Sequence, residues 1–426
     1  MKGSPLKYLL DLNDSGTWGN DPTGEGDTVV LRSTDIRLDG SWRISDPAVR
    51  HVNRHDKVRK RLAFGDIVVV KSSGSPEHLG KSAIVTKEVA AMRPCFANFV
   101  QRLRPSPSTD SRYIWYVLNS KWAADEMASL GNTTTGLRNL NGTIIGSLRI
   151  PARGIHEQRA IADYLDIETN RIDTLIAKKR RMIQLLGEYD RRTLDDLLDG
   201  IRQNGLARLG YLAEVRSGLT LGGARANSRS HVTLPYLRVA NVQHDRLDLS
   251  EVKSVTVDTT TARRTALRHG DVLMTEGGDI DKLGRGTVWR GEIDPCLHQN
   301  HVFAVRVRTK NLLPEFLALL TRTSYARQYF ERTGVRSTNL ASTSSSKVAD
   351  FRIPLPSRST QSHLVSVYQR KWETLERTRV ATGLQVDLLN ERRQALITTA
   401  VTGESPVPGM AAWQRCLAEG HAPEEG

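Results

Sequence analysis

Three residues of types that bind zinc lie close together in the chain. Cys296, His298 and His301 fall within the short stretch CLHQNH. A structural zinc site needs four protein ligands, and a catalytic site needs three ligands and a water molecule. No second cluster of Cys and His residues completes such a set, so ordinary strand positions are the favoured interpretation. We expect neither a metal ion nor another cofactor.

Two further stretches contain residue types found in enzymes that act on DNA. Glu251-Val252-Lys253 resembles the end of a nuclease metal-binding triad, but no upstream Pro-Asp pair introduces it. The stretch GGDIDKLGRG lies between predicted strands and opens no helix, so it is not a typical phosphate-binding loop. The Asn/Asp-Pro-Pro-aromatic motif with which DNA methyltransferases hold a flipped base is absent. We therefore expect no catalytic residue.

The charge balance indicates a polyanionic partner. The 426 residues include 61 Lys and Arg against 47 Asp and Glu, a formal net charge of +14. Nucleic acid is the commonest partner of such a chain. No apolar run approaches the ~18 residues of a membrane-spanning helix, and the first residues contain no signal-peptide core. Three distant cysteines fit a reducing compartment, so we expect a cytoplasmic protein without membrane contact.

The sequence contains two copies of one pattern. A shift of 203 positions places Ile150-Pro151 on Ile353-Pro354, and the same shift places Gln158 on Gln361. The upstream matches are FGDIVVVKSSG from Phe64 with HGDVLMTEGGD from His269, and FVQRLR from Phe99 with FAVRVR from Phe303. These matches slip by a few residues, as expected where surface loops differ in length. The chain is therefore expected to contain two units of one shape.

Each copy is predicted to be a strand-rich domain followed by a long helix. Gly-Asp before a β-branched apolar run predicts a turn and a buried strand, and Arg-Ile-Pro predicts a strand end. From Ile155 to about Leu198, apolar residues recur at heptad-like spacing, which predicts a helix of ~60 Å with a helix partner. The expected seam contains Leu165, Ile172 and Leu186, with companions Leu175, Met182 and Tyr189 and flanking Ile176 and Ile183. A second long helix is expected after Pro356.

The amino-acid sequence of the two helical regions resembles that of the specificity subunit of Type I restriction-modification systems. The resemblance rests on IPARGIHEQRAIADYLDIETNRIDTLIAKKRRMIQLL from Ile150, FRIPLPSRSTQ from Phe351, and LLNERRQALITTAVTG ending at Gly403. It covers residues from about 4 to 403. It implies an α+β fold with two target recognition domains, each followed by a long helix, and the two helices pairing as an antiparallel coiled coil. In the second copy EQRAIADYLD is replaced by QSHLVSVYQR, so a partner's contacts there are expected to differ.

The resemblance also implies a function. Each recognition domain reads one half of a bipartite double-stranded DNA target, and the helices set the spacer and dock two methyltransferase subunits. Catalysis, in DNA methylation and phage defence, belongs to those subunits and to restriction (translocase-nuclease) subunits. The expected boundaries are 1–151 and 201–356 for the recognition domains, 152–200 and 357–403 for the helices, and 404–426 for a flexible tail. The alternatives are a coiled-coil scaffold and a self-contained nuclease or methyltransferase.

Base reading requires side chains with paired donor and acceptor geometry, such as Arg or Lys for guanine and Asn or Gln for adenine. The candidates lie where the two copies differ: Lys71, Ser72, Ser73, Lys81, Thr134, Arg138 and Asn139 in the first, and Asn241, Gln243, Glu276, Lys282, Arg285, Arg336, Ser337 and Asn339 in the second. The candidates for docking a methyltransferase subunit are Gln158, Arg159, Ile161, Leu165, Ile172 and Gln361. The basic runs 50–61 and 178–181 are solvated helix surfaces or phosphate-contacting patches.

Overall fold

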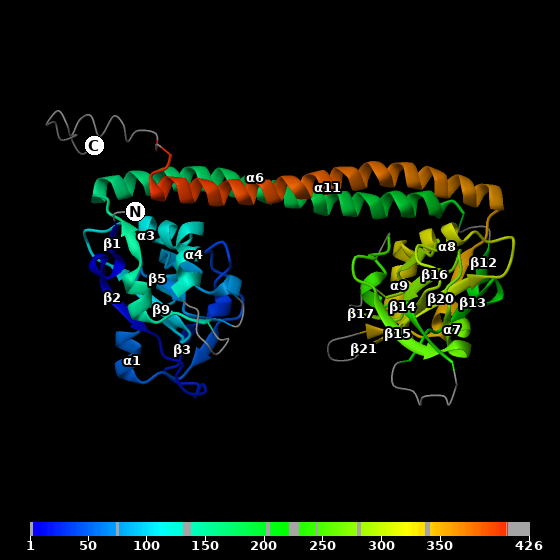
Figure 1. Cartoon of the computed structure of the whole chain (residues 1–426), viewed down its shortest axis with the longest axis horizontal. Helices are drawn as coiled ribbons and strands as arrows, with labels where there is room; N and C mark the ends of the chain where they lie inside the picture. Colours follow the sequence, from blue (N-terminus) through cyan, green and yellow to red (C-terminus); the bar gives the residue numbers. More distant parts are fainter. Residues whose placement is uncertain are drawn as a thin grey trace. The chain divides into compact units, whose positions relative to one another are not determined.

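The computed structural model describes residues 3–73, 76–130, 138–201, 205–220, 230–243, 246–278, 283–336, 341–405 and 407. The chain divides into two compact units, unit 1 from Met1–Lys179 with Leu384–Gly426, and unit 2 from Arg180–Gly383. Both boundaries fall inside long helices, α6 (Ile155–Asp199) and α11 (Arg358–Thr402) (Figure 1). Each of these helices therefore contributes to the two units in turn. The predicted recognition-domain boundaries stay predictions, and most of the predicted tail lies outside the described residues.

Unit 1 contains two principal sheets with helices packed on them. Its strands are β1 (Gly3–Pro5), β2 (Leu10–Ser15), β3 (Thr28–Leu31), β4 (Ala48–Arg50), β5 (Ile67–Val70), β6 (Ser72–Ser73), β7 (Ser82–Ile84), β8 (Cys95–Phe96), β9 (Val100–Pro105), β10 (Arg138–Asn139) and β11 (Arg149–Pro151). Its shorter helices are α1 (Arg54–Arg59), α2 (Lys87–Ala91), α3 (Ser111–Leu118), α4 (Lys121–Leu130) and α5 (Gly142–Ser147). The sheets have the orders β2-β9-β5-β7 and β4-β3-β8.

Unit 2 repeats this arrangement. Its strands are β12 (Leu206–Arg208), β13 (Ala213–Arg216), β14 (His231–Leu237), β15 (Lys253–Asp258), β16 (Val272–Thr275), β17 (Gly277–Gly278), β18 (Gly286–Val288), β19 (Leu297–His298), β20 (Val302–Val307), β21 (Val335–Arg336), β22 (Ala341–Ser342) and β23 (Arg352–Pro354). Its shorter helices are α7 (Thr259–Thr265), α8 (Pro314–Thr321), α9 (Ser324–Thr333) and α10 (Ser345–Asp350). The principal sheets have the orders β13-β20-β16-β18 and β15-β14-β19.

The Gly-Asp turn has a defined structural role in each copy. The Asp66 carboxylate, at the start of β5, receives two hydrogen bonds from Arg104 at 2.6 and 2.7 Å. In unit 2, Asp271 receives two from Arg306 at 2.8 and 2.7 Å. The preceding glycines have φ near +85°, a conformation that favours glycine because it has no side chain (84° at Gly65 and 86° at Gly270). The two residues thus turn the chain and anchor the central strand.

The Arg-Ile-Pro strands close each unit as the sequence predicts. In unit 1, β11 pairs antiparallel with β1, and in unit 2, β23 pairs antiparallel with β12. The isoleucine of each tripeptide is fully buried, and it belongs to the main hydrophobic core of its unit. Because the proline has no N–H to donate, each strand ends there and a long helix begins a few residues later.

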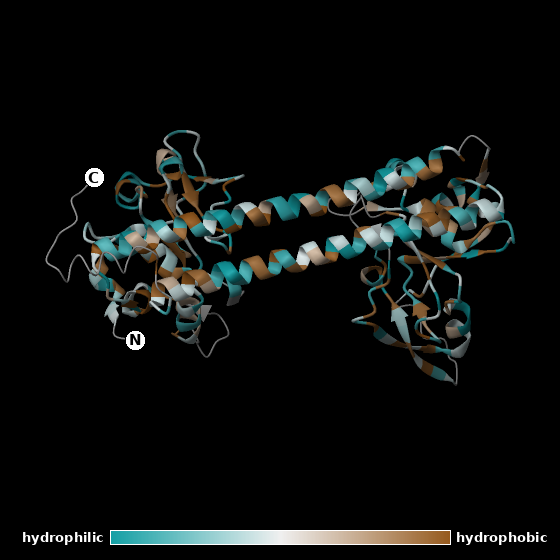
Figure 2. Ribbon diagram, turned by 90° about the horizontal axis from the view of Figure 1, so that it is seen from above, coloured by the Kyte–Doolittle hydropathy of each residue, from teal (hydrophilic) through white to brown (hydrophobic). Residues whose placement is uncertain are grey.

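The two long helices contact each other through one heptad-like stripe within unit 1. Ile172 and Ile176 of α6 pack on Val386 of α11. Beside this stripe, Arg393 donates to Asp173 at 2.9 Å, and the Lys179 ammonium donates to Gln385 at 2.6 Å. Residue numbers rise along α6 as they fall along α11, so the two segments are antiparallel. Hydrophobic residues recur along both helices in Figure 2.

The predicted companion positions of this seam are wrong. Leu175, Met182 and Tyr189 are 46, 44 and 58% exposed, whereas Ile172 and Ile176 are 5% exposed. The buried positions alternate by four and three residues through Ala162, Leu165, Thr169, Ile172 and Ile176. In a heptad the second core position therefore lies four residues after Ile172, at Ile176, instead of three residues after it. Among the described residues, no helix is both long and apolar enough to cross a membrane.

Candidate nucleic-acid interface

The turn after the central strand carries opposite charges in the two units. Lys71 follows β5, and Glu276 follows β16. The Lys71 N–H donates to the Phe99 carbonyl at 3.1 Å, and the Glu276 N–H donates to the His301 carbonyl at 2.9 Å. Phe99 is the last residue of the loop between β8 and β9, and His301 is the last residue of the equivalent loop between β19 and β20. Lys71 and Glu276 therefore occupy one position of the repeat.

A neighbouring side chain holds each of these charged groups. The Lys71 ammonium donates to Ser15 Oγ, and burial, followed by the nearby charge of Lys60, lowers the pKa of Lys71. In unit 2, a Glu276 carboxylate oxygen lies 2.8 Å from His301 Nδ1. Ser15 is not among the residues predicted from the sequence, and His301 is considered there only as a zinc ligand. The sequence alignment of the repeat did not supply this signal, because it matched Phe99 with Phe303. The strand pairings correct that match by two residues and place His301 at the position of Phe99.

Four predicted base-reading residues of unit 1 lie on one two-stranded ribbon beside Lys71. In this ribbon β6 pairs with β10, with Ser73 opposite Arg138 and Ser72 opposite Asn139. The Leu140 N–H donates to the Lys71 carbonyl at 2.6 Å and fixes the end of the ribbon against the turn. Thr134 lies outside the described residues. Tertiary structure thus brings together residues that are more than sixty positions apart in the sequence.

The corresponding ribbon of unit 2 has three strands. Strand β22 pairs with β17 and with β21, so that Arg336 lies opposite Ala341. The Thr343 N–H donates to the Glu276 carbonyl at 2.7 Å, as Leu140 does to Lys71. Lys282, Ser337 and Asn339 lie outside the described residues. The two ribbons therefore lie beside equivalent turns of their units, but they differ in amino-acid sequence and in number of strands.

Lys81 and Arg285 occupy a second equivalent pair of positions. The Val70 N–H donates to the Lys81 carbonyl, and the Thr275 N–H donates to the Arg285 carbonyl, at 2.9 and 3.1 Å. The Lys81 ammonium donates to the Ile36 carbonyl, and burial is the largest cause of its lowered pKa. In this structure Lys81 is therefore used inside unit 1.

Asn241 is buried and stabilises a turn. Its side-chain oxygen accepts the Arg238 N–H at 2.8 Å, and its amide nitrogen donates to the carbonyls of Asp248 and Glu251. In unit 1, Asp35 accepts the Arg32 N–H in the same way at 2.7 Å. This pairing gives Asn241 a structural role in place of an open base-reading face. Gln243 is half-buried and donates through its amide to the Ala240 carbonyl at 2.7 Å.

The basic run 50–61 includes helix α1 of unit 1. Within it Arg54, His55 and Arg59 are exposed, while the Lys60 ammonium donates to Asp14 at 2.9 Å. In the run 178–181, three of the four basic residues are exposed, and the fourth, Lys179, binds Gln385. Both runs thus present charge to solvent, which fits either of their two interpretations.

The three residues of the CLHQNH stretch have separate surroundings. Cys296 is buried, and burial raises the pKa of its thiol to about 12. The His298 ring is also buried, with Nδ1 at 2.6 Å from the Val302 carbonyl. His301 pairs with Glu276. Among the residues that the structure describes, no group of three or more His, Cys, Asp or Glu side chains could hold a metal ion.

Most of the predicted docking residues are interior. Ile161, Leu165 and Ile172 are buried, as are Gln158 and Gln361, which are 3 and 0% exposed. Gln158 accepts the Asp110 N–H and donates to the Arg153 carbonyl, both at 2.9 Å. Gln361 likewise accepts the Leu313 N–H at 2.9 Å and donates to the Pro356 carbonyl at 2.8 Å.

These contacts explain the glutamine shared by the two copies. Each one fastens the first turn of a long helix to the loop before it and to the N-terminus of a shorter helix earlier in the chain, α3 for Gln158 and α8 for Gln361. This structural role does not favour a contact with a partner through these five side chains. Arg159 alone among the six predicted residues is exposed.

The comparisons with known proteins agree with this architecture. No family model matches the chain. It is 25% identical over 289 residues to the specificity subunit of the type I restriction enzyme EcoKI of Escherichia coli (strain K12), covering 64% of this chain but only 60% of that relative. It is 20% identical over 357 residues to the StySPI specificity subunit of Salmonella potsdam, covering 82% of this chain and 76% of that relative.

The fold also has a counterpart among solved structures. A chain from a type I R-M system, studied for complex assembly and conformational transition, has a TM-score of 0.62 and 15% identity, covering 93% of this chain and 96% of that one. The predicted α+β fold with two strand-rich domains and long helices is confirmed. The chain is a relative of the specificity subunits of type I restriction enzymes.

Proposed function

We propose that the chain is the non-catalytic DNA sequence-recognition subunit of a type I restriction-modification complex. Each unit reads one half of a bipartite DNA target. Two methyltransferase subunits dock on the chain, restriction subunits join through the complex, and these partners carry out catalysis. The complex acts on DNA in the cytoplasm. The net charge of +14 supports binding to a polyanion.

One observation carries the proposal, namely that the same framework surrounds different turn chemistry in the two units. The Asp66–Arg104 and Asp271–Arg306 pairs are alike in geometry, whereas Lys71 is replaced by Glu276 at the equivalent turn. A lysine suits the acceptors of guanine, and a glutamate suits the amino group of cytosine. A duplicated scaffold with divergent turns is what two readers of different half-sites require.

The proposed DNA-facing set omits two predicted residues. Asn241 is left out because it is buried and its amide is used inside a turn, and Lys81 is left out because its ammonium donates to a backbone carbonyl in a partly buried contact. The set retains Lys71, Ser72, Ser73, Thr134, Arg138, Asn139, Gln243, Glu276, Lys282, Arg285, Arg336, Ser337 and Asn339. For partner docking, Arg159 is the retained residue.

The test uses the full chain with and without methyltransferase subunits. We expect the assembled complex to bind one bipartite sequence above other DNA, and to methylate it with S-adenosylmethionine. The chain alone, given S-adenosylmethionine or Mg²⁺ and the same DNA, should neither methylate nor cleave. Turnover by the chain alone would contradict the proposal, as would a complex without sequence preference.

A further inference from the structure

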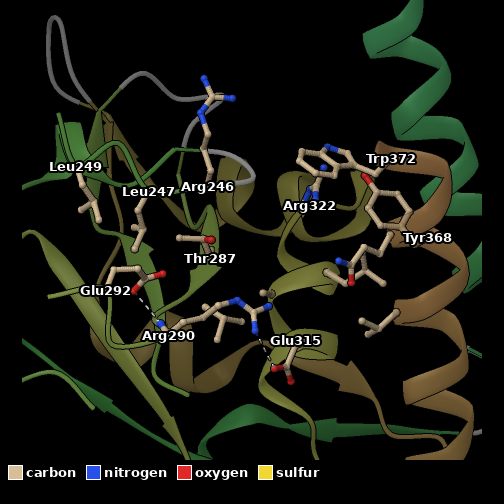
Figure 3. A pocket seen from close by; sticks show the side chains of 16 residues that line it. Arg246, Leu247, Leu249, Thr287, Arg290, Glu292, Glu315, Arg322, Tyr368 and Trp372 are labelled. Carbon is tan, nitrogen blue, oxygen red and sulfur yellow. Dashed lines mark hydrogen bonds and ion pairs between the residues drawn. The ribbon is translucent and has the colours of Figure 1, made fainter. Parts of the chain in front are cut away.

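Unit 2 contains a cavity of about 420 Å³ beside an edge strand. Its walls come from β18, α8, α11 and the loop at residues 246–249. Figure 3 shows Tyr368 and Trp372 of α11 on one side and Leu247 and Leu249 on the other. The Arg290 side chain lies near Glu315, with Arg290 Nη1 4.0 Å from Glu315 Oε1. This volume lies within the range of about 300–1,000 Å³ typical of small-molecule sites.

The equivalent place in unit 1 is occupied by two tryptophans. There the edge strand is β7, the last strand of the order β2-β9-β5-β7. The Trp42 indole N–H donates to the Ile84 carbonyl at 2.7 Å, and the Trp115 indole N–H donates to the Ser82 carbonyl at 3.1 Å. The two rings thus cover the edge and satisfy its outward carbonyls.

The register of the repeat identifies the residues that replace these rings. Gln158 accepts the Asp110 N–H and Gln361 accepts the Leu313 N–H, so Asp110 and Leu313 are equivalent positions. Trp115 and Ala318 lie five residues after them and are therefore equivalent too. An isolated antiparallel bridge joins Ile36 to Trp42 in unit 1, and another joins Val242 to Leu247 in unit 2. Trp42 and Leu247 are therefore equivalent positions of the repeat. Both replacements, Ala318 and Leu247, line the cavity. The cavity therefore lies where unit 1 holds two indole rings.

The edge strand of unit 2 keeps the matching hydrogen-bond acceptors. The backbone of Arg285 and that of Trp289 form hydrogen bonds with the chain at either end of β16. Because backbone groups in an antiparallel pair point alternately toward and away from the partner strand, the carbonyls of Gly286 and Val288 point away from the sheet. Thr321 reaches the Gly286 carbonyl at 3.5 Å. Among the described residues, no indole N–H donates to the Val288 carbonyl, which corresponds to the Trp42-bonded carbonyl of Ile84.

The opposite wall offers an aromatic surface and the Arg322 guanidinium, whose Nη2 lies 3.5 Å from the Asp190 carboxylate. The Arg322 guanidinium lies 5.0 Å from the ring centre of Tyr368 and 5.9 Å from that of Trp372. Its Nε atom is buried and has no hydrogen-bond partner within the part of the chain that the structure describes. The π-faces of Tyr368 and Trp372, with Leu247 and Leu249 opposite, suit a flat apolar ring.

We propose that this cavity is a binding site for a small planar heteroaromatic ligand of two-ring, indole-like size that carries a ring N–H. The N–H donates to the Val288 carbonyl, as the Trp42 indole does to Ile84 in unit 1. The rings lie between Leu247 and the Trp372 side. The site belongs to unit 2 alone and does not depend on the proposed role in DNA recognition.

The test measures the binding of indole to the full chain by calorimetry or ligand-detected NMR. Saturable binding with a dissociation constant on the order of 1 mM is expected for so small a ligand. The matched probe 1-methylindole keeps the rings but lacks the N–H donor. It should bind about five- to tenfold more weakly, the loss expected for one hydrogen bond.

Variants that carry unit 1 residues locate the site. Ala318→Trp and Leu247→Trp should each weaken indole binding at least tenfold and should not lower the melting temperature. Ala381→Trp makes the same change as Ala318→Trp at an exposed position of α11 in unit 2 and should leave binding unchanged. Absence of saturable indole binding to the parent chain, or full affinity in both filling variants, would overturn the site. Equal affinity for 1-methylindole would overturn the role of the N–H.

Discussion

At the scale of single residues, each unit is held by a buried carboxylate paired with an arginine. Asp66 and Asp271 are each 1% exposed, and each accepts two hydrogen bonds from one guanidinium. Burying a carboxylate costs free energy unless it is paired and hydrogen-bonded. The position is therefore sensitive to loss of either partner.

We expect Asp66→Ala and Asp271→Ala to lower the free energy of unfolding by about 3 kcal/mol each, because each leaves an arginine without its carboxylate. Glu168→Ala is the control. Its partner Arg171 is 70% exposed, so the loss should be about 0.5 kcal/mol or less. Urea unfolding of the three variants measures these differences. A loss at Asp66 no larger than that at Glu168 would contradict the structural role of the Gly-Asp turn.

A buried histidine gives unit 2 a pH-dependent stability. Burial lowers the pKa of His298, although its contact with the Val302 carbonyl acts in the opposite direction. Because the pKa is lower in the folded state, the unfolded chain binds more protons in acid. The stability that the neutral, buried His298 contributes is present above about pH 6.5, the pKa of histidine in an unfolded chain. It is lost as the pH falls from there toward the lower pKa of His298 in the folded protein.

The equivalent residue of unit 1 supplies the variant that tests this. Phe96 pairs with Leu31 as His298 pairs with Leu237. His298→Phe should therefore lose less stability than the parent chain between pH 7 and pH 5. Melting temperatures of the two proteins across this range provide the measurement. Parallel curves would show that His298 does not titrate on unfolding.

At the scale of elements, the sequence predicted strands and helices better than contacts. The Gly-Asp turns and Arg-Ile-Pro strand ends are local signals, because they depend on backbone geometry and on a missing N–H. The seam of α6 depends on which of two apolar residues, Leu175 or Ile176, faces inward. Both fit an apolar pattern near Ile172, and only the contact with Val386 distinguishes them.

The candidate site was predictable to a similar extent. Lys71, Ser72 and Arg138 were found because they lie where the copies differ, and the structure places them on or beside one ribbon. Asn241 was chosen for its donor and acceptor groups, which the fold uses inside a turn. Side-chain chemistry alone does not reveal whether an amide faces the backbone or the solvent.

The register of the seam predicts a contrast between adjacent residues. Ile176→Ala should lower the free energy of unfolding by about 2–3 kcal/mol, because it opens a cavity between Ile172 and Val386. Leu175→Ala removes a side chain that is 46% exposed and should cost less than about 1 kcal/mol. Denaturant unfolding of both variants provides the comparison. Equal losses, or a larger loss at Leu175, would restore the register expected from the sequence.

At the scale of the whole molecule, the long helices connect the two proposed readers in the sequence. Four residues inserted after Lys179 in α6, together with four after Gly383 in α11, would lengthen each helix by ~6 Å. Four residues are close to one turn of ~3.6 residues, so the apolar stripe should keep nearly its original facing. We expect a longer gap, by one or two base-pair steps of ~3.4 Å, between unchanged half-sites. Methylome sequencing that finds the original gap would mean that the helices do not set the spacing.

The central claim is that each unit reads its own half of a bipartite target. The most direct measurement exchanges residues 1–146 for the corresponding segment of a relative with a different target, and then sequences the methylome of cells that carry the assembled complex. The exchange leaves unit 2 residues, including Glu276, unchanged. We predict a new sequence in one half of the methylated target and the original sequence in the other half. A change in both halves, or in neither, would contradict the claim.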